Sequence, residues 1–93
     1  MVAIVWTEIA MEDLRLIHEY ISKDSVMSAD KQIDKIINRV DQIAIFPRSG
    51  RVVPEFNSEI IRELIEGSYR IIYQINSDAI GIVRIHHTAR QLK

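Results

Sequence analysis

The sequence of 93 residues contains no cysteine, only three glycines and two prolines, and a single tryptophan. Without cysteine, the chain can form neither a disulfide nor a thiolate metal site. The low glycine and proline content, together with 47% hydrophobic and 27% charged residues, argues against disorder and predicts a globular protein. A chain of this length is expected to form one domain, residues 1–93, with little core to spare.

A strong charge of either sign is also absent, because the formal net charge is −1. This excludes a protein that holds nucleic acid by bulk positive charge. The charges are unevenly distributed, however. Residues 1–50 carry eight acidic and six basic residues, whereas residues 51–93 carry five acidic and six basic residues, five of them arginine. A local anion site in the second half is compatible with this balance.

Long apolar runs are missing as well. The first residues reach a charge at Glu8, with no basic stretch followed by an apolar one as a secretory signal would have. No run approaches the ~20 apolar residues that a transmembrane helix needs. We therefore expect a cytoplasmic protein that has no contact with a membrane.

The N-terminal part of the chain predicts a strand followed by a helix. The apolar run Val2–Trp6 is too short for a helix and is typical of a buried strand. Thr7 follows as an N-cap residue, and the helix after it is expected to end near Asp24. The apolar face of this helix repeats at spacings of four, three and four residues: Ala10, Leu14, Ile17 and Ile21.

A second amphipathic helix is predicted to follow the polar segment Ser25–Asp30, which supplies a turn and a cap, and to end near Ala44. Two helices joined by so short a link form an antiparallel hairpin. Pro47 stops the second helix. Residues 46–56 contain both prolines and predict a loop.

The last third of the chain, Glu59–Arg90, predicts three strands with tight turns at 67–68 and 77–78. The first turn places Ile65 opposite Arg70, and continuing through the second places Arg70 opposite Ile85. His87 then falls on the same face as Arg70. The residues expected to face the helices are Tyr69, Ile71, Tyr73 and Ile75.

The predicted fold class is α+β, in the order β-α-α-β-β-β. We expect a twisted, antiparallel-rich sheet with the two-helix hairpin packed on one face. The opposite face, which carries Arg70, has no helix left to cover it.

The predicted sheet holds an unusual number of polar donors, which makes it the first place to seek a functional site: Arg62, Arg70, Arg84, His86, His87 and Arg90. A mid-strand arginine costs desolvation energy, so Arg70 is expected either to contact an anion of a target or to pair with Glu63 or Glu66. His87 is expected either to act as a base or to hydrogen-bond within the sheet.

The histidines do not predict a metal site. His86 and His87 are neighbours, so on a strand they point to opposite faces, and His18 has no histidine four residues further on. We expect neither a metal nor a cofactor. The acidic residues of the first predicted helix are typical of a solvated face: Glu12, Asp13 and Glu19.

The order of elements and three segments together resemble the RelE/ParE superfamily of toxins from type II toxin–antitoxin systems. The segments are PRSGRVVPEF, REL-IEGSYRIIYQI and IVRIHHTARQL. The resemblance covers essentially the whole chain and favours the ParE-like branch, whose members are often called plasmid stabilisation proteins. It implies a growth-inhibiting toxin that a cognate antitoxin neutralises in a hetero-oligomer, by laying a helix and an extended tail over it.

Two activities are known for the superfamily. RelE-like members resemble ribosome-dependent mRNA endonucleases, and ParE-like members inhibit DNA gyrase without that catalytic set. By resemblance, Arg70 and Arg90 match the two arginines of the RelE motifs. The two strand lysines of RelE are replaced by Ile61 and Glu63, and a histidine-using relative such as YoeB would place its base near His87.

Three functional hypotheses follow. The first and favoured one is a non-enzymatic inhibitor of DNA gyrase, because the acid–base residues are mostly missing; its target or anion contacts would be Arg62, Arg70, Arg84 and Arg90. The second is a ribonuclease that acts on mRNA at the ribosome, with His87 as base and two arginines, Arg70 and Arg90, on the scissile phosphate. The third is an inert, degenerate member of the family.

Overall fold

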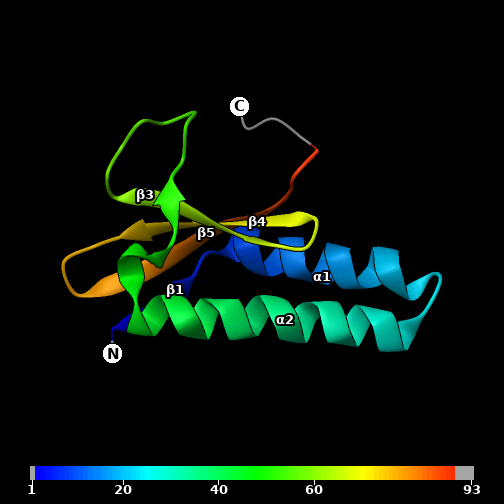
Figure 1. The fold of residues 1–93 in the computed structure, drawn as a ribbon. Coiled ribbons are helices and arrows are strands. Elements are labelled where there is room, and N and C mark those ends of the chain that lie inside the picture. Colours follow the sequence, from blue (N-terminus) through cyan, green and yellow to red (C-terminus); the bar gives the residue numbers. More distant parts are fainter. Residues whose placement is uncertain (1, 90–93) are drawn as a thin grey trace.

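The structure, a computed structural model, describes residues 2–89 and contains a five-stranded mixed sheet with two helices along one face (Figure 1). The strand order is β1-β5-β4-β3-β2. This confirms the predicted α+β class and the order of the predicted elements. Along the chain the elements are β1 (Ala3–Trp6), α1 (Glu8–Ser22), α2 (Val26–Ile45), the short 3-10 helix η1 (Pro47–Ser49), β2 (Arg51–Val52), β3 (Ile61–Glu66), β4 (Tyr69–Ile75) and β5 (Ala79–His87).

Both long helices begin at a side-chain cap. The Thr7 hydroxyl accepts the Ala10 N–H at 3.0 Å, as predicted for an N-cap, and the Ser25 hydroxyl accepts the Ser28 N–H at 3.1 Å. The predicted link at 25–30 is too long, because α2 already starts at Val26. Ser25 alone acts as the N-cap, so the polar residues that follow it in this segment are part of the helix.

The segment 46–56, predicted as a loop, contains a strand that the sequence pattern misses. Arg51 and Val52 pair with Glu63 and Arg62 of β3 in antiparallel register. A strand of two residues is too short for an alternating pattern. It is recognised only through its partner, since the Arg51 Nε donates to the Glu63 carboxylate at 2.5 Å.

The predicted register between β3 and β4 is confirmed: Glu66 lies opposite Tyr69, and Ile65 lies opposite Arg70. Two residues are enough for this turn because Gly67 adopts a φ of 60°, which an L side chain rarely adopts. The alternation of strand side chains then follows from the turn.

The register between β4 and β5 is predicted correctly only as far as Tyr73, which pairs with Ile82. A bulge follows, so that Ile72 pairs with Arg84 and Val83 has no residue directly opposite it. The carbonyl of this extra residue accepts the Thr7 hydroxyl at 2.9 Å.

The bulge corrects two predictions. Arg70 lies opposite His86, not Ile85, and His87 lies opposite Tyr69. Since neighbouring residues of a strand point to opposite faces, His87 is on the helix-covered side and not on the face of Arg70. The prediction failed because the contact that fixes the extra residue comes from the start of α1, about seventy residues away in sequence.

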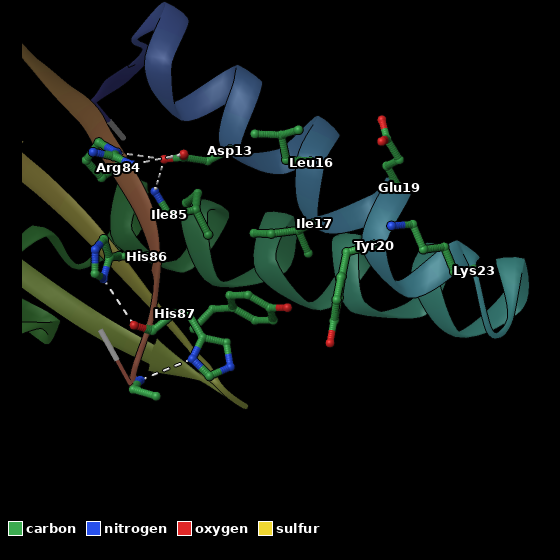
Figure 2. Close-up of a pocket in the computed structure, with 12 residues that line it drawn as sticks. Asp13, Leu16, Ile17, Glu19, Tyr20, Lys23, Arg84, Ile85, His86 and His87 are labelled. Atoms are coloured by element: carbon green, nitrogen blue, oxygen red, sulfur yellow. Dashed lines mark hydrogen bonds and ion pairs between the residues drawn. The ribbon is translucent and has the colours of Figure 1, made fainter. Parts of the chain in front are cut away.

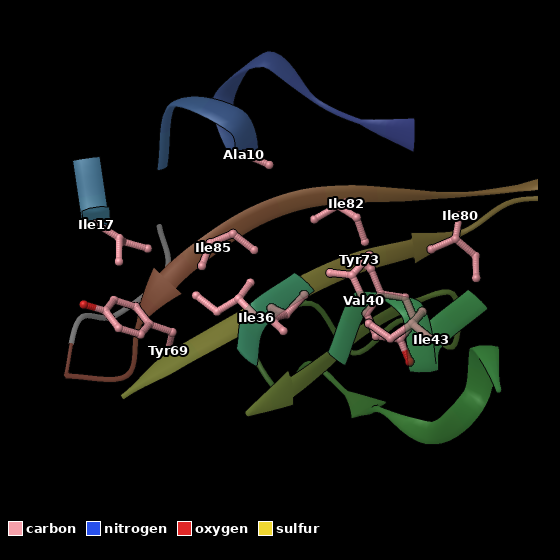
Figure 3. Packing of buried hydrophobic residues seen from close by; sticks show 11 residues of the cluster. Ala10, Ile17, Ile36, Val40, Ile43, Tyr69, Tyr73, Ile80, Ile82 and Ile85 are labelled. Atoms are coloured by element: carbon pink, nitrogen blue, oxygen red, sulfur yellow. The ribbon is translucent and has the colours of Figure 1, made fainter. Parts of the chain in front are cut away.

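The core lies between the helices and one face of the sheet (Figure 3). As predicted, Tyr69, Ile71 and Tyr73 point into it, and Ile75 packs at its margin. They meet apolar residues of both helices and of β5: Ala10, Ile17, Ile36, Val40, Ile43, Ile80, Ile82 and Ile85. This packing leaves the other face of the sheet free of helices.

Tyr73 also anchors the segment after α2. The Tyr73 hydroxyl donates to the Pro47 carbonyl at 2.6 Å and accepts the Gly50 N–H at 2.9 Å. The backbone approaches so closely that a Cβ at Gly50 would lie 2.5 Å from both the Glu63 carbonyl oxygen and the Tyr73 hydroxyl. Only glycine fits at this position without a shift of the backbone.

We therefore expect Gly50→Ala to lower the free energy of unfolding by about 1–3 kcal/mol, as overpacking of a filled site does. Urea denaturation followed by circular dichroism measures the change. Gly81→Ala is the matched control, because its added methyl group would meet a single neighbour, the Asn76 side chain at 3.9 Å. An equal loss of unfolding free energy in the two variants would show that crowding at Gly50 does not cause the loss.

Candidate functional site

On the sheet face away from the helices, Arg70 lies within a cluster of charged side chains. Only 8% of Arg70 is exposed. Its Nε donates to Glu63 Oε1 at 2.6 Å, while Nη1 and Nη2 donate to the two carboxylate oxygens of Glu55 at 2.9 and 3.0 Å. The predicted pairing with Glu63 is therefore present, and a second carboxylate completes the shell around the guanidinium.

Glu63 is the most deeply buried charge of this cluster, with 1% of the residue exposed. It also accepts the Arg51 Nε, so that it lies between two arginines. Such a buried carboxylate is tolerated because both oxygens are paired. The hydrogen bond from Arg70 to Glu55 is the largest of the influences on the pKa of Arg70 and raises it above the ordinary value, against the effect of burial.

Arg62, another predicted contact residue, forms hydrogen bonds with the neighbouring loops. Its Nη1 donates to the Gly50 carbonyl at 2.9 Å, and its Nε and Nη2 donate to the carbonyl and the carboxylate of Glu59, each at 3.0 Å. Because Arg62 and Glu63 are adjacent on β3, Arg62 points to the face opposite the Arg70 cluster. The structure thus does not bring Arg62 and Arg70 together.

Arg84 is held by Asp13 of α1. The Arg84 Nε and Nη2 donate to the two carboxylate oxygens at 2.9 and 3.2 Å, and the same carboxylate accepts the backbone N–H of Ile85 at 2.9 Å (Figure 2). The hydrogen bond to Asp13 is the main cause that raises the pKa of Arg84. Arg84 is therefore anchored at the junction of α1 with the bulge, although 42% of its side chain is exposed.

Asp13 also belongs to the candidate site, through its bonds to Arg84 and Ile85, but the sequence pattern does not reveal this role. Its neighbours Glu12 and Glu19 are solvated and share Arg15, as expected for a charged helix face. Asp13 differs, since its side chain is only 13% exposed. Helical spacing is the signal that could have found it, because Asp13 lies three residues after Ala10 and four before Ile17, on the buried side.

His87 lies against the ring of Tyr69, with ring centroids 5.5 Å apart in an edge-to-face arrangement. Its Nδ1 accepts the backbone N–H of Ala89 at 3.1 Å, which makes Nε2 the protonated nitrogen of the neutral ring. His86 Nδ1 instead donates to the His87 carbonyl at 3.0 Å. The neutral His87 therefore has its lone pair already engaged, and it is separated by the sheet from Arg70.

A groove of about 570 Å³ lies between α1 and the second half of β5 (Figure 2). Leu16, Ile17 and Tyr20 line it from the helix, and Ile85 and His87 from the strand. Other exposed apolar residues lie on the same helix, among them Ile9, which is 58% exposed, and Tyr20 of the groove is 71% exposed. At this edge β1 pairs with β5 only as far as Ile82, and beyond it Thr7 and Asp13 bond to the Val83 carbonyl and the Ile85 N–H.

Arg90, the remaining predicted contact residue, lies outside the described residues. Within residues 2–89 there is no group of three metal-ligating side chains, and no helix in that range is long and apolar enough to cross a membrane.

Comparison with known proteins decides the family. The family model of the ParE toxin of the type II toxin–antitoxin system parDE matches residues 4–92. The chain belongs to the ParE toxin family. It is therefore the toxin component of a type II toxin–antitoxin system, and the family implies a cognate antitoxin as its partner.

Relatives agree with this membership in the ParE toxin family. The chain is 33% identical over 91 residues to Toxin RelE2 of Caulobacter vibrioides. This alignment covers 97% of this chain and 99% of that protein. It is also similar to a chain of the chromosomal ParDE TA system from P. aeruginosa, with a TM-score of 0.77, 23% identity, and coverage of 94% and 96%. The YoeB/ParE toxin from Agrobacterium tumefaciens gives a TM-score of 0.64, 13% identity, and coverage of 91% and 96%. The two solved structures support the fold, and the resemblance to the RelE/ParE superfamily is confirmed.

The position of Asp13 gives a test of how α1 holds β5. Asp13→Ala leaves the Arg84 guanidinium and the Ile85 N–H without their acceptor, so we expect a loss of about 1–3 kcal/mol of unfolding free energy. Hydrogen exchange should report the same change locally, as faster exchange at the Ile85 amide. Glu12→Ala, on the same helix, is the control and should leave both quantities unchanged, because its bond to Arg15 is exposed. Slow exchange at Ile85 in the Asp13 variant would contradict the role assigned to this carboxylate.

Proposed function

We propose that this toxin is a non-enzymatic inhibitor that acts in the cytoplasm by binding DNA gyrase. The observation that carries the proposal is the separation of His87 from Arg70 by the sheet. A ribonuclease would need its base and its phosphate-stabilising arginine on one side of the scissile bond. In the described part of the chain His87, the base predicted from the sequence, and the central arginine face opposite ways.

Two further observations support binding over catalysis. The hydrogen-bond donors of Arg70 are directed at carboxylates, and the neutral His87 ring has Nδ1 engaged by a backbone amide. Arg70 is thus already bound to two carboxylates, and the neutral His87 ring has no lone pair left with which to accept a proton. A surface that only binds a protein partner needs neither a free base nor a free arginine.

We propose further that the antitoxin is held at the groove between α1 and β5. An amphipathic helix could lay its apolar face against Leu16 and Tyr20. The groove offers the apolar wall that the predicted helix of an antitoxin requires.

Purified toxin added to a gyrase supercoiling reaction should inhibit supercoiling, whereas the same toxin added to ribosomes translating a defined mRNA should leave the mRNA intact. His87→Ala should inhibit gyrase as well as the unaltered toxin, because the side chain is not catalytic. Codon-localised cutting of the mRNA that disappears in His87→Ala would instead establish a ribonuclease. No effect in either reaction, with no growth defect on expression, would identify an inert protein.

The antitoxin surface is tested by Tyr20→Ala, which removes a large exposed ring from the groove. We expect the dissociation constant of the toxin–antitoxin complex to rise at least about tenfold, as for a central aromatic contact, with no change in toxin stability. Isothermal titration calorimetry measures the affinity. Ile37→Ala removes an exposed apolar side chain of α2 that does not line the groove, and it should bind the antitoxin normally. Equal affinities for the two variants would place the antitoxin elsewhere.

A further inference from the structure

We propose that the loop of residues 53–60, called the strap here, conceals a carboxylate-binding site at Arg70, and that Glu55 occupies this site until an acidic side chain of a protein target displaces it. This proposal rests on the proposed function, because it assigns a protein target to the Arg70 face. Figure 1 shows the strap, between β2 and β3, on the side of the sheet away from the helices.

The two carboxylates bound to Arg70 are held very differently. Glu63 comes from the neighbouring strand, its side chain has no exposed surface, and it is shared with Arg51. Glu55 comes from the irregular strap, and 33% of its side chain is exposed. Displacement of Glu55 exchanges one partly solvated carboxylate for another, whereas displacement of Glu63 would strand a buried charge.

The geometry of the Glu55 pair is that of an intermolecular carboxylate site. Nη1 and Nη2 donate side by side to the two oxygens of one carboxylate, which is the bidentate arrangement that arginine offers to a carboxylate ligand. Glu63 meanwhile holds Nε at 2.6 Å. Glu63 also lies 2.5 Å from Nη2. When Glu55 leaves, the guanidinium therefore keeps its orientation, and Nη1 together with the second N–H of Nη2 can bind an incoming carboxylate.

The turn that carries Glu55 is built from its own backbone. The Val53 carbonyl accepts the N–H groups of Phe56 and Asn57 at 3.2 and 3.0 Å. Asn57 has a φ of 48°, a left-handed conformation that asparagine tolerates better than most residues. These bonds stay within the strap, so the turn can keep its shape while Glu55 exchanges its contact with β4.

Charge and surroundings favour a carboxylate from a protein. Among residues 2–89 the cluster has two arginines and two glutamates, Arg51, Arg70, Glu55 and Glu63. Replacing one carboxylate by another preserves this balance. A nucleic acid would gain no long-range attraction from a chain of net charge −1. Phe56, beside Glu55, and Ile65, opposite Arg70, are 46% and 42% exposed and suit an apolar protein surface.

The site can be tested on the isolated toxin with two small oxyanions. In protein labelled with nitrogen-15, the Nε–Hε resonance of Arg70, identified by its absence in Arg70→Lys, is followed while acetate or dimethyl phosphate is added. We expect Glu55→Gln to reach half-saturation with acetate at a concentration at least about tenfold lower than the unaltered toxin, since the internal competitor has lost its charge. Dimethyl phosphate, which mimics a nucleic-acid phosphate, should shift this resonance less than acetate.

Glu59→Gln is the matched control. It removes an acid from the same strap that pairs with Arg62 and Arg48 instead of Arg70, so its acetate titration should match that of the unaltered toxin. If Glu55→Gln does not fold, Glu55→Asp keeps the charge on a shorter side chain and should still lower the half-saturating concentration.

Equal acetate titrations for the folded Glu55 variant and the unaltered toxin would overturn the proposal, and a stronger response to dimethyl phosphate would overturn the assignment to a carboxylate. Failure of the toxin to inhibit gyrase would refute the proposed target but leave these titrations interpretable. The two proposals therefore fail by different results.

Discussion

The sheet depends on one buried carboxylate, that of Glu63. A charge without exposed surface is tolerated in a protein only when it is fully paired, and here two arginines approach it from different strands. Arg51 attaches the two-residue β2 to β3, and Arg70 attaches β4 and, through Glu55, the strap. The helix-free half of the molecule is thus organised by electrostatics, whereas the other half is organised by apolar burial.

The bulge in β5 determines what each face of the sheet presents. One extra residue at Val83 moves His87 to the side of Tyr69 and leaves His86 opposite Arg70. The contacts that hold this part of β5, from Thr7 to Val83 and from Asp13 to Ile85, both come from the N-terminal part of the molecule. A small displacement in register thereby places His87 and Arg70 on opposite faces of the sheet.

The sequence was sufficient for features that depend on local spacing. The caps at Thr7 and Ser25, the helix-facing tyrosines and the pairing of Ile65 with Arg70 follow from periodicity and from the length of one turn. The sequence was insufficient where a distant residue decides the local structure. The short β2 is defined by its pairing with Glu63, and the bulge is held by α1.

The residues of the candidate site were likewise predicted only in part. Arg70 was recognised because a mid-strand arginine needs a partner, and one of the two predicted carboxylates, Glu63, provides it. Glu55 was not recognised, because it lies fifteen residues away in an irregular segment without periodicity. Asp13 looked like one more solvated acid until its orientation toward β5 was known.

The parallel pairing of β1 with β5 has a consequence for synthesis of the toxin. β1 precedes the other strands of this sheet in the chain, and its partner residues, Ala79 to Ile82, follow both helices and the strands β2, β3 and β4. The sheet therefore closes late, by a contact between distant parts of the chain, and such contacts form slowly. During translation the residues of the helical hairpin are made before the strand that completes its core, so the nascent chain exposes apolar surface until β5 is added.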